Sequence, residues 1–236
     1  MNTAAVIVFA RAPRAGATKT RLIPALGAAG AAQLYEQLLA RTLLQVAVLP
    51  DVARMVYVDV PSAGAYFRAR LALTDWDIEV QQGSTLGARM AHALDQALRR
   101  HAHVILIGSD IVDFKAIDLA QALQALARGN EVVLGPAADG GYWLVGLGSP
   151  QPALFTDIPW GSAQVYGDTV ARLMAQGTRW SKLRECHDID RPADLARHTA
   201  ALAELLPHSA LLAGELRAKL LDTTGLARLK ADKAGA

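Results

Sequence analysis

The feature that most constrains the fold of this 236-residue chain is a regular alternation of short β-branched runs with longer helical patterns. Such alternation is typical of α/β proteins, in which parallel strands are joined by helices that cover both faces of a sheet. We therefore predict a single α/β domain with a mostly parallel central sheet over residues 1–206. Strands are expected at 4–10, 55–60, 76–81, 103–107, 131–134, 142–147 and 180–183. Helices are expected at 27–49, through 66–71, and at 86–100, 117–128, 162–176 and 191–206.

The remaining residues, 207–236, are predicted to form a helical extension with a frayed end. Hydrophobic residues make up 52% of the chain, which is enough for a large core. The net charge of +2 argues against nucleic acid or an anionic membrane as partner. A single cysteine, Cys186, excludes an internal disulfide. With no signal peptide or membrane-spanning run recognised, we expect a soluble cytoplasmic protein of undetermined oligomeric state.

Four basic side chains follow the first predicted strand, namely Arg11, Arg14, Lys19 and Arg21. Pro13 and Gly16 interrupt any regular helix here and allow the backbone to turn around a ligand. Arginine and lysine are suited to phosphate oxygens, so this loop is a candidate site for a nucleotide diphosphate or triphosphate. A solvated basic loop is the alternative. The spacing matches neither a Walker A loop nor a dinucleotide-binding glycine motif.

Carboxylates that could hold a metal occur at the end of the fourth strand and near the start of the last predicted helix. Asp110 follows the buried run at 103–107, and Asp190 precedes Pro192. One or two carboxylates, completed by substrate and water, suit Mg²⁺. The alternative for both residues is a capping role, and Asp190 stands where a helix N-cap is expected.

Two glycine-containing connections complete the candidate residues. Asp139-Gly140-Gly141 is a strong hairpin signal, yet its glycines also permit close approach of a ligand, and Asp139 could bind a sugar or acceptor hydroxyl. The segment after the third strand could bind a nucleobase, a ribose or a phosphate. The alternative is that it is a plain connection between a strand and a helix. Its candidate residues are Gln82, Gly83, Gly87 and Arg89.

In this order, these segments resemble the bacterial glycosyltransferase-A-like proteins grouped as domain of unknown function 2064. The resemblance covers about residues 4–200. It rests on F-x-[KR]-x-P-x-x-G-x-x-K-T-R-L at 9–22, Q-G-x-x-L-G-x-R-M at 82–90, G-[ST]-D at 108–110, G-P-A-x-D-G-G-Y at 135–142, I-P-W at 158–160 and D-[IV]-D-x-P-x-D-L at 188–195. Related proteins include phospholactate and molybdopterin guanylyltransferases.

The resemblance implies a Rossmann-like GT-A fold, that of the nucleotide-diphospho-sugar transferases. It further implies that Lys19 and Arg21 contact phosphates and that Asp110 and Asp190 hold Mg²⁺ or Mn²⁺. One departure stands out, because the family commonly continues G-[ST]-D with Cys-Pro, whereas this chain has Ile111-Val112. The departure puts the presentation of the metal loop and the identity of the substrate in question.

Three functions are compatible with these residues. The first is a metal-dependent glycosyltransferase that uses a nucleotide-diphosphate sugar and a small acceptor. The second is a nucleotidyltransferase, which the cationic loop, the widely separated carboxylates and the lack of a local Asp-x-Asp favour. The third is a nucleotide-binding protein without catalysis, which the altered Ile111-Val112 loop favours. We take the first as the leading hypothesis.

Overall fold

The structure is a computed structural model that describes residues 3–70 and 75–205. By their contacts these residues form two compact units. The first contains residues 3–12, 43–109 apart from the gap at 71–74, and 114–187. The second contains residues 13–42, 110–113 and 188–205. The predicted domain of residues 1–206 includes both units, whereas the extension expected at 207–236 lies outside the described residues.

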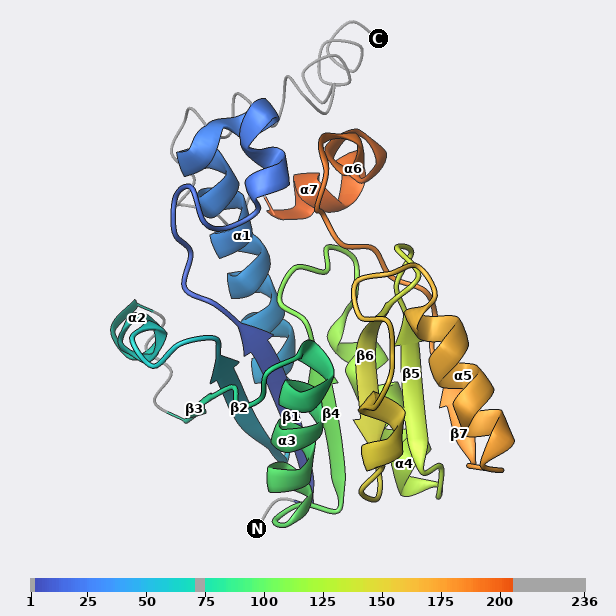
Figure 1. Cartoon of the computed structure of the whole chain (residues 1–236). Helices are drawn as coiled ribbons and strands as arrows, with labels where there is room; N and C mark the ends of the chain where they lie inside the picture. The colour runs from blue at the N-terminus through green and yellow to red at the C-terminus, as the bar shows by residue number, and fades with distance from the viewer. Residues whose placement is uncertain (1–2, 71–74, 206–236) are drawn as a thin grey trace, which may run out of the picture. The chain divides into compact units, whose positions relative to one another are not determined.

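The first unit is built on a seven-stranded sheet with the order β3-β2-β1-β4-β6-β5-β7 (Figure 1). Every strand is parallel to the others except β6, which is antiparallel to both of its neighbours. The prediction of an α/β fold with a mostly parallel sheet is therefore confirmed. The strands are β1 (Ala4–Ala10), β2 (Val52–Val58), β3 (Asp77–Val80), β4 (His103–Ile107), β5 (Val132–Pro136), β6 (Tyr142–Leu147) and β7 (Trp180–Lys182).

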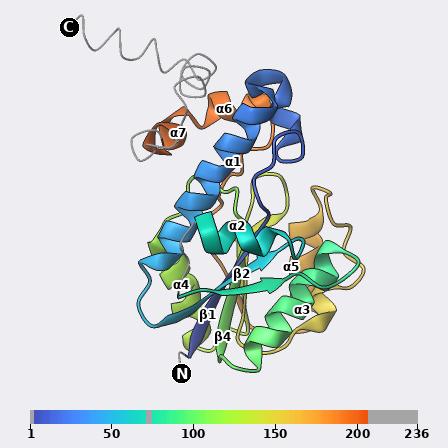
Figure 2. The same cartoon turned by 90° about the vertical axis from the view of Figure 1, so that its left-hand side faces the viewer.

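Helices cover both faces of this sheet because its strands are apolar on both sides. The connecting helices are α2 (Ala63–Arg70), α3 (Leu86–Leu98), α4 (Ala116–Ala127), the 3-10 turn η2 (Pro152–Phe155) and α5 (Val165–Ala175). One face, which includes Ile7 and Leu106, packs against α3, η2 and α5. Leu126 of α4 meets Ile105 on the opposite face, beside Gly146. Figure 2 shows α4 on one side of the sheet and α3 and α5 on the other.

The second unit is helical. It contains the 3-10 turn η1 (Thr20–Leu22), the first part of α1 (Ile23–Ala47), and the two short helices α6 (Pro192–Arg197) and α7 (Thr199–Leu205). Its core brings together buried side chains from all three of its chain segments. They are Leu22, Leu26, Ala31, Leu34, Leu38, Val112, Ile189, Leu195, Leu202 and Leu205.

Two expected helices differ from those observed. Helix α1 begins at Ile23 and is interrupted by Gly27, whose φ of 73° and ψ of 166° are not helical, so the residue expected to start the helix is a kink within it. The single helix expected over 191–206 is two helices, because His198, with φ −109° and ψ 32°, leaves the helical region. Other boundaries shift by a few residues, as is usual at helix and strand ends. Within the described part of the chain, no helix combines the length and apolar character needed to cross a membrane.

Candidate functional site

The sheet order reverses at β1 and β4. Strands β2 and β3 lie on one side of β1, and β4 lies on its other side, with Val8 paired to Ile107. In open α/β sheets, ligands bind beyond the carboxyl ends of the strands at such a switch point. The chain leaves these two strand ends into the basic loop and into the segment that contains Asp110.

Four of the predicted site residues lie together in the second unit. The Nζ atom of Lys19 donates a hydrogen bond to Asp110 Oδ2 at 2.9 Å and lies 3.7 Å from Asp190 Oδ1. Arg21 Nη1 donates to Asp190 Oδ2. The side chain of Lys19 is 7% exposed, whereas those of Asp110 and Asp190 are 37% and 31% exposed. We call Lys19, Arg21, Asp110 and Asp190 the charged quartet; its formal charges sum to zero.

Apolar neighbours hold the three segments of the quartet in place. Leu22 follows Arg21, Ile189 precedes Asp190, and Val112 lies two residues beyond Asp110; all three are buried in the core of the second unit. The backbone of Ile111 also forms an antiparallel bridge with Asp188. At the departure from the family pattern, the Ile111-Val112 pair therefore fastens the Asp110 segment to the residues around Asp190.

The capping role considered for Asp190 is wrong. Helix α6 has Arg191 at its N-cap, and the carboxylate that accepts the backbone N–H groups is Asp194 Oδ2, at 3.1 Å from Asp190 N and 2.7 Å from Arg191 N. Pro192 occupies the first turn, as expected. Asp110 does not cap helix α4 either, because Asp118 accepts the N–H of Lys115 there. Both quartet carboxylates therefore face cations.

The basic loop turns tightly before Lys19. The hydroxyl of Thr18, which is buried, accepts the backbone N–H of Arg14 at 3.0 Å. Gly16 has a φ of +80°, and no atom would lie within 4 Å of a side chain placed there. Open space beside a glycine that the turn requires leaves room for a ligand. Arg11 is exposed and belongs to the first unit, so it is not part of the charged quartet.

The connection after β3 forms a closed loop in the first unit. The Thr85 hydroxyl accepts the N–H of Ala88 at 3.1 Å and caps α3. Arg89 Nε donates back to the carbonyl of Gly83 at 3.0 Å, so this side chain closes its own loop. Gln82 and Gly83 are exposed, whereas Gly87 is buried. The exposed start of this loop is the part that a ligand can reach.

The predicted hairpin turn at Asp139-Gly140-Gly141 joins β5 to β6. Asp139 Oδ1 accepts the N–H of Gly141 at 2.9 Å, while the side chain of Asp139 stays exposed. Gly140 has a φ of +90°, and a side chain there would lie 2.2 Å from the carbonyl oxygen of Ala163. Next along the chain, the buried hydroxyl of Tyr142 has no hydrogen-bond partner among the described residues, and burial raises the pKa of this phenol.

The I-P-W segment at 158–160, for which no role was predicted, contacts both glycine connections. A side chain at Gly87 would lie 2.4 Å from Trp160 Nε1 and 2.6 Å from the carbonyl oxygen of Phe155. The ring of Trp160 also meets Tyr142 edge to face, with centroids 6.1 Å apart. Trp160 therefore packs between the start of α3 and the residue after the hairpin turn. The only sequence signal for this was the resemblance at 158–160.

The geometry of Asp110 and Asp190 shows whether they fit the divalent metal that the resemblance implies. The ammonium of Lys19 is a cation within 3.7 Å of an oxygen of each carboxylate, so Asp110 and Asp190 can face one positive ion. Among the described residues, no group of three or more His, Cys, Asp or Glu side chains converges. Two carboxylates fit Mg²⁺ or Mn²⁺ when substrate oxygens and water supply the other ligands. They do not form an all-protein cage.

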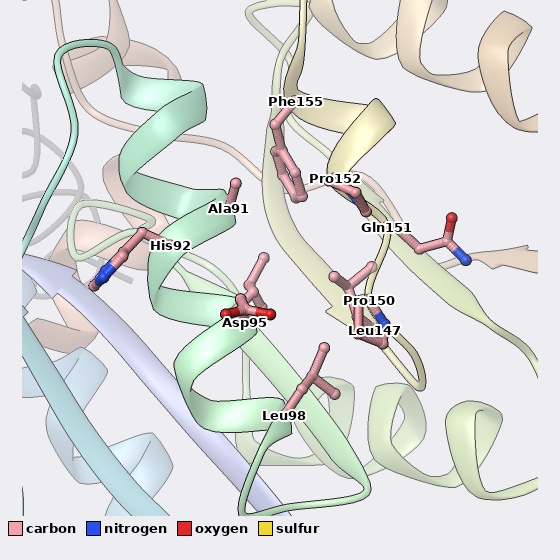
Figure 3. Close-up of a pocket in the computed structure, with 10 residues that line it drawn as sticks. Ala91, His92, Asp95, Leu98, Leu147, Pro150, Gln151, Pro152 and Phe155 are labelled. Carbon is pink, nitrogen blue, oxygen red and sulfur yellow. The ribbon is translucent and has the colours of Figure 1, made fainter.

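A cavity of about 270 Å³ lies elsewhere in the first unit, between α3 and the segment that follows β6. Leu147, which lines it, pairs with Val104 and Val132, so the cavity is at the amino ends of the parallel strands. Its lining is mostly apolar, and Figure 3 shows the imidazole of His92 on the far side of α3 from Phe155. None of the predicted site residues lines it.

Comparison with known proteins supports the fold. The sequence profile of a family described as uncharacterized protein conserved in bacteria (DUF2064) matches residues 42–162, just over half of the chain. The basic loop and the segment around Asp190 lie outside the matched residues. No curated protein matches the sequence.

Among solved structures, a provisionally assigned nucleotide-diphospho-sugar transferase from Desulfovibrio desulfuricans G20 is 28% identical, with a TM-score of 0.80 over 93% of this chain and 99% of that one. The inositol-1-phosphate CTP transferase from T. maritima is 11% identical, with a TM-score of 0.55 over 89% and 99% of the two chains. A cytidylyltransferase from Leptospira borgpetersenii serovar Hardjo-bovis (strain JB197) is 10% identical, with a TM-score of 0.53 over 98% and 96%. The last two are similar in fold alone. The predicted nucleotide-diphospho-sugar transferase fold and the transferase class are confirmed.

Proposed function

This chain belongs to the DUF2064 family of bacterial proteins, and we propose that it is a metal-dependent glycosyltransferase that uses a nucleotide-diphosphate sugar as donor and a small molecule as acceptor. The observation that carries the proposal is the charged quartet, in which the cations of the basic loop meet the carboxylates of two distant segments. The likeness to the Desulfovibrio protein favours a sugar donor over other activated nucleotides.

Within this proposal, Lys19 and Arg21 bind the diphosphate of the donor. Their ammonium and guanidinium groups offset the charge that builds on the leaving diphosphate as the bond to the sugar breaks. Asp110 and Asp190 would hold Mg²⁺ or Mn²⁺, which when bound supplies Lewis-acid stabilisation to the same oxygens. Gly16 leaves open space beside the turn before Lys19.

The loops of the first unit are proposed to bind the rest of the substrates. Gln82 and Gly83, at the exposed start of the loop, contact the nucleobase or ribose, and Arg89 stabilises that loop through Gly83 while its guanidinium can reach phosphate. The exposed carboxylate of Asp139 accepts hydrogen bonds from a sugar or acceptor hydroxyl. Further candidates for these contacts are Arg11, Gly140 and Gly141; the predicted candidate Gly87 is not among them, because it is buried against Trp160.

Nucleotidyl transfer is the second candidate function. It is favoured by the two carboxylates, which lie far apart in the sequence and are tied to a cationic loop. It is also favoured by the lack of a local Asp-x-Asp motif. Val112 stands at the position of the second aspartate of that motif, and it is buried in the core of the second unit. In this reaction an acceptor phosphate attacks the α-phosphate of a nucleoside triphosphate, and pyrophosphate leaves. The same cations would then bind the departing pyrophosphate.

A binding protein without catalysis is the third candidate, and it differs from the others in predicting binding without turnover. To separate the three, we would titrate the full chain by calorimetry, with Mg²⁺, against nucleoside triphosphates and nucleotide-diphosphate sugars. Tighter binding of a sugar donor than of the matching diphosphate is expected. Incubation with candidate acceptors should then release a nucleoside diphosphate, whereas release of pyrophosphate would favour the second candidate.

Asp110→Asn supplies the matched control for this experiment. Asp110 is partly exposed and is not a helix cap, so the variant should keep its fold and lose the metal-dependent part of the binding. Wild-type protein that binds neither class of nucleotide in the presence of Mg²⁺ would refute the proposal altogether.

A further inference from the structure

The chain's own Lys19 is a cation that lies close to both quartet carboxylates. Lys19 Nζ lies 2.9 Å from Asp110 and 3.7 Å from Asp190, and at 7% exposure its side chain is far less accessible than either carboxylate. Arg21 pairs with the second oxygen of Asp190. Both negative charges are therefore already neutralised by the protein.

The backbone of Lys19 presents this ammonium in an unusual conformation. Its φ of 50° and ψ of 46° are left-handed, a region that residues other than glycine, asparagine and aspartate rarely adopt. The conformation is held on both sides, because Thr18 N donates to the carbonyl of Arg14 at 3.0 Å and the buried Leu22 donates its N–H to Lys19 O at 2.9 Å. Unusual backbone conformations of this kind persist where the surrounding structure enforces them, often at binding sites.

We propose that Lys19 is a built-in competitor for the divalent cation, which keeps metal away from Asp110 and Asp190 until an anionic ligand takes over the ammonium. The inference rests on the proposed function for the assignment of the two carboxylates to the metal. With the quartet neutral, a divalent ion gains little attraction and meets two positive groups. When phosphate oxygens accept hydrogen bonds from Lys19 and Arg21, these cations no longer compensate the negative charges of the two carboxylates. Metal and phosphate then bind cooperatively, and each strengthens the binding of the other equally.

The test is Mn²⁺ binding to the full chain without nucleotide, read by electron paramagnetic resonance and calorimetry. Lys19→Met removes the charge at similar length and should raise the affinity for Mn²⁺ on the order of tenfold or more, within the usual range of coupling between two sites. Lys19→Arg, which keeps the charge, should bind Mn²⁺ as weakly as the wild type. Adding Asp110→Asn to Lys19→Met should abolish the gain, which would locate the ion.

A matched control is Lys115→Met, which removes one positive charge from an exposed lysine of the first unit and should leave Mn²⁺ affinity unchanged. If Lys19→Met fails to fold, Lys19→Asn replaces it, because asparagine tolerates left-handed backbone angles better than other side chains. The inference is overturned if the wild type binds Mn²⁺ as tightly as the neutral variants, or if neither binds it.

The two proposals can fail separately. Tight nucleotide binding with no gain of Mn²⁺ affinity in the Lys19 variants would overturn the competitor role and leave the proposed function standing. A gain of Mn²⁺ affinity in a protein that binds no nucleotide would support the competitor role and refute the proposed function.

Discussion

Two aspartates four residues apart should have separable effects, because only one of them accepts the backbone N–H groups at the start of helix α6. Asp194 Oδ2 accepts the backbone N–H groups of Asp190 and Arg191 at 3.1 and 2.7 Å, and the Asp194 side chain is only 19% exposed. Asp190 instead directs its carboxylate to Lys19 and Arg21 and is 31% exposed. We predict that Asp194→Ala lowers stability and that Asp190→Asn removes metal-dependent ligand binding with little loss of stability.

The expected magnitudes follow from these contacts. Loss of an aspartate cap costs about 1 kcal/mol, which for a chain of this size lowers the melting temperature by roughly 2–4 °C. Partly exposed ion pairs contribute about 0–1 kcal/mol. In Asp190→Asn, Lys19 also keeps its shorter contact, which is the one with Asp110. The loss of stability in this variant should therefore fall at the lower end of that range.

Both variants would be measured by thermal and urea unfolding followed by circular dichroism, and by calorimetry with Mg²⁺ and the nucleotide that the wild type binds best. Asp194→Ala should also weaken binding, though by less than Asp190→Asn, because it loosens the segment that positions Asp190. Equal destabilisation by the two variants, or unchanged stability of Asp194→Ala, would show that the assignment of the cap is mistaken.

Gly87→Ala places a methyl group 2.4 Å from Trp160 Nε1 and should destabilise the protein by about 1–3 kcal/mol. The control is Gly167→Ala, which lies in open space within α5 and should be neutral or stabilising. Comparable urea midpoints for the two variants would contradict the packing of Trp160 on Gly87. Tyr142→Phe removes a buried hydroxyl that lacks a partner and should stabilise by about 1 kcal/mol. Because burial raises the pKa of Tyr142, the folded protein keeps the phenol proton where the unfolded chain has released it, so wild-type stability falls as the pH rises above about 10. Tyr142→Phe should lose less stability there, and an identical alkaline decline in both proteins would refute this.

The strands and the types of site residue could be predicted from local sequence. The runs at 4–10, 103–107 and 142–147 coincide with β1, β4 and β6, because dense β-branched and apolar segments have few other ways to bury themselves. The Asp-Gly-Gly hairpin was predicted equally well, since Gly140 needs a positive φ. The roles proposed for the site residues stay predictions.

Side-chain partners could not be predicted in this way. The sequence pattern predicts Asp190 at the N-cap of the last helix, whereas Arg191 occupies that position and Asp194, in the first turn, supplies the carboxylate that accepts the backbone N–H groups there. Likewise, the break at His198 has no evident signal in the residues around it.

The sequence by itself determined the alternation of strands and helices, the cationic loop after β1 and the carboxylate after β4, since propensity and periodicity act over a few neighbouring residues. The tertiary structure alone decided that Lys19 meets Asp110 and Asp190, that Val112 belongs to the core of the second unit, and that Trp160 packs on Gly87. These contacts join residues distant along the chain, and their geometry depends on how whole elements pack together rather than on any local pattern.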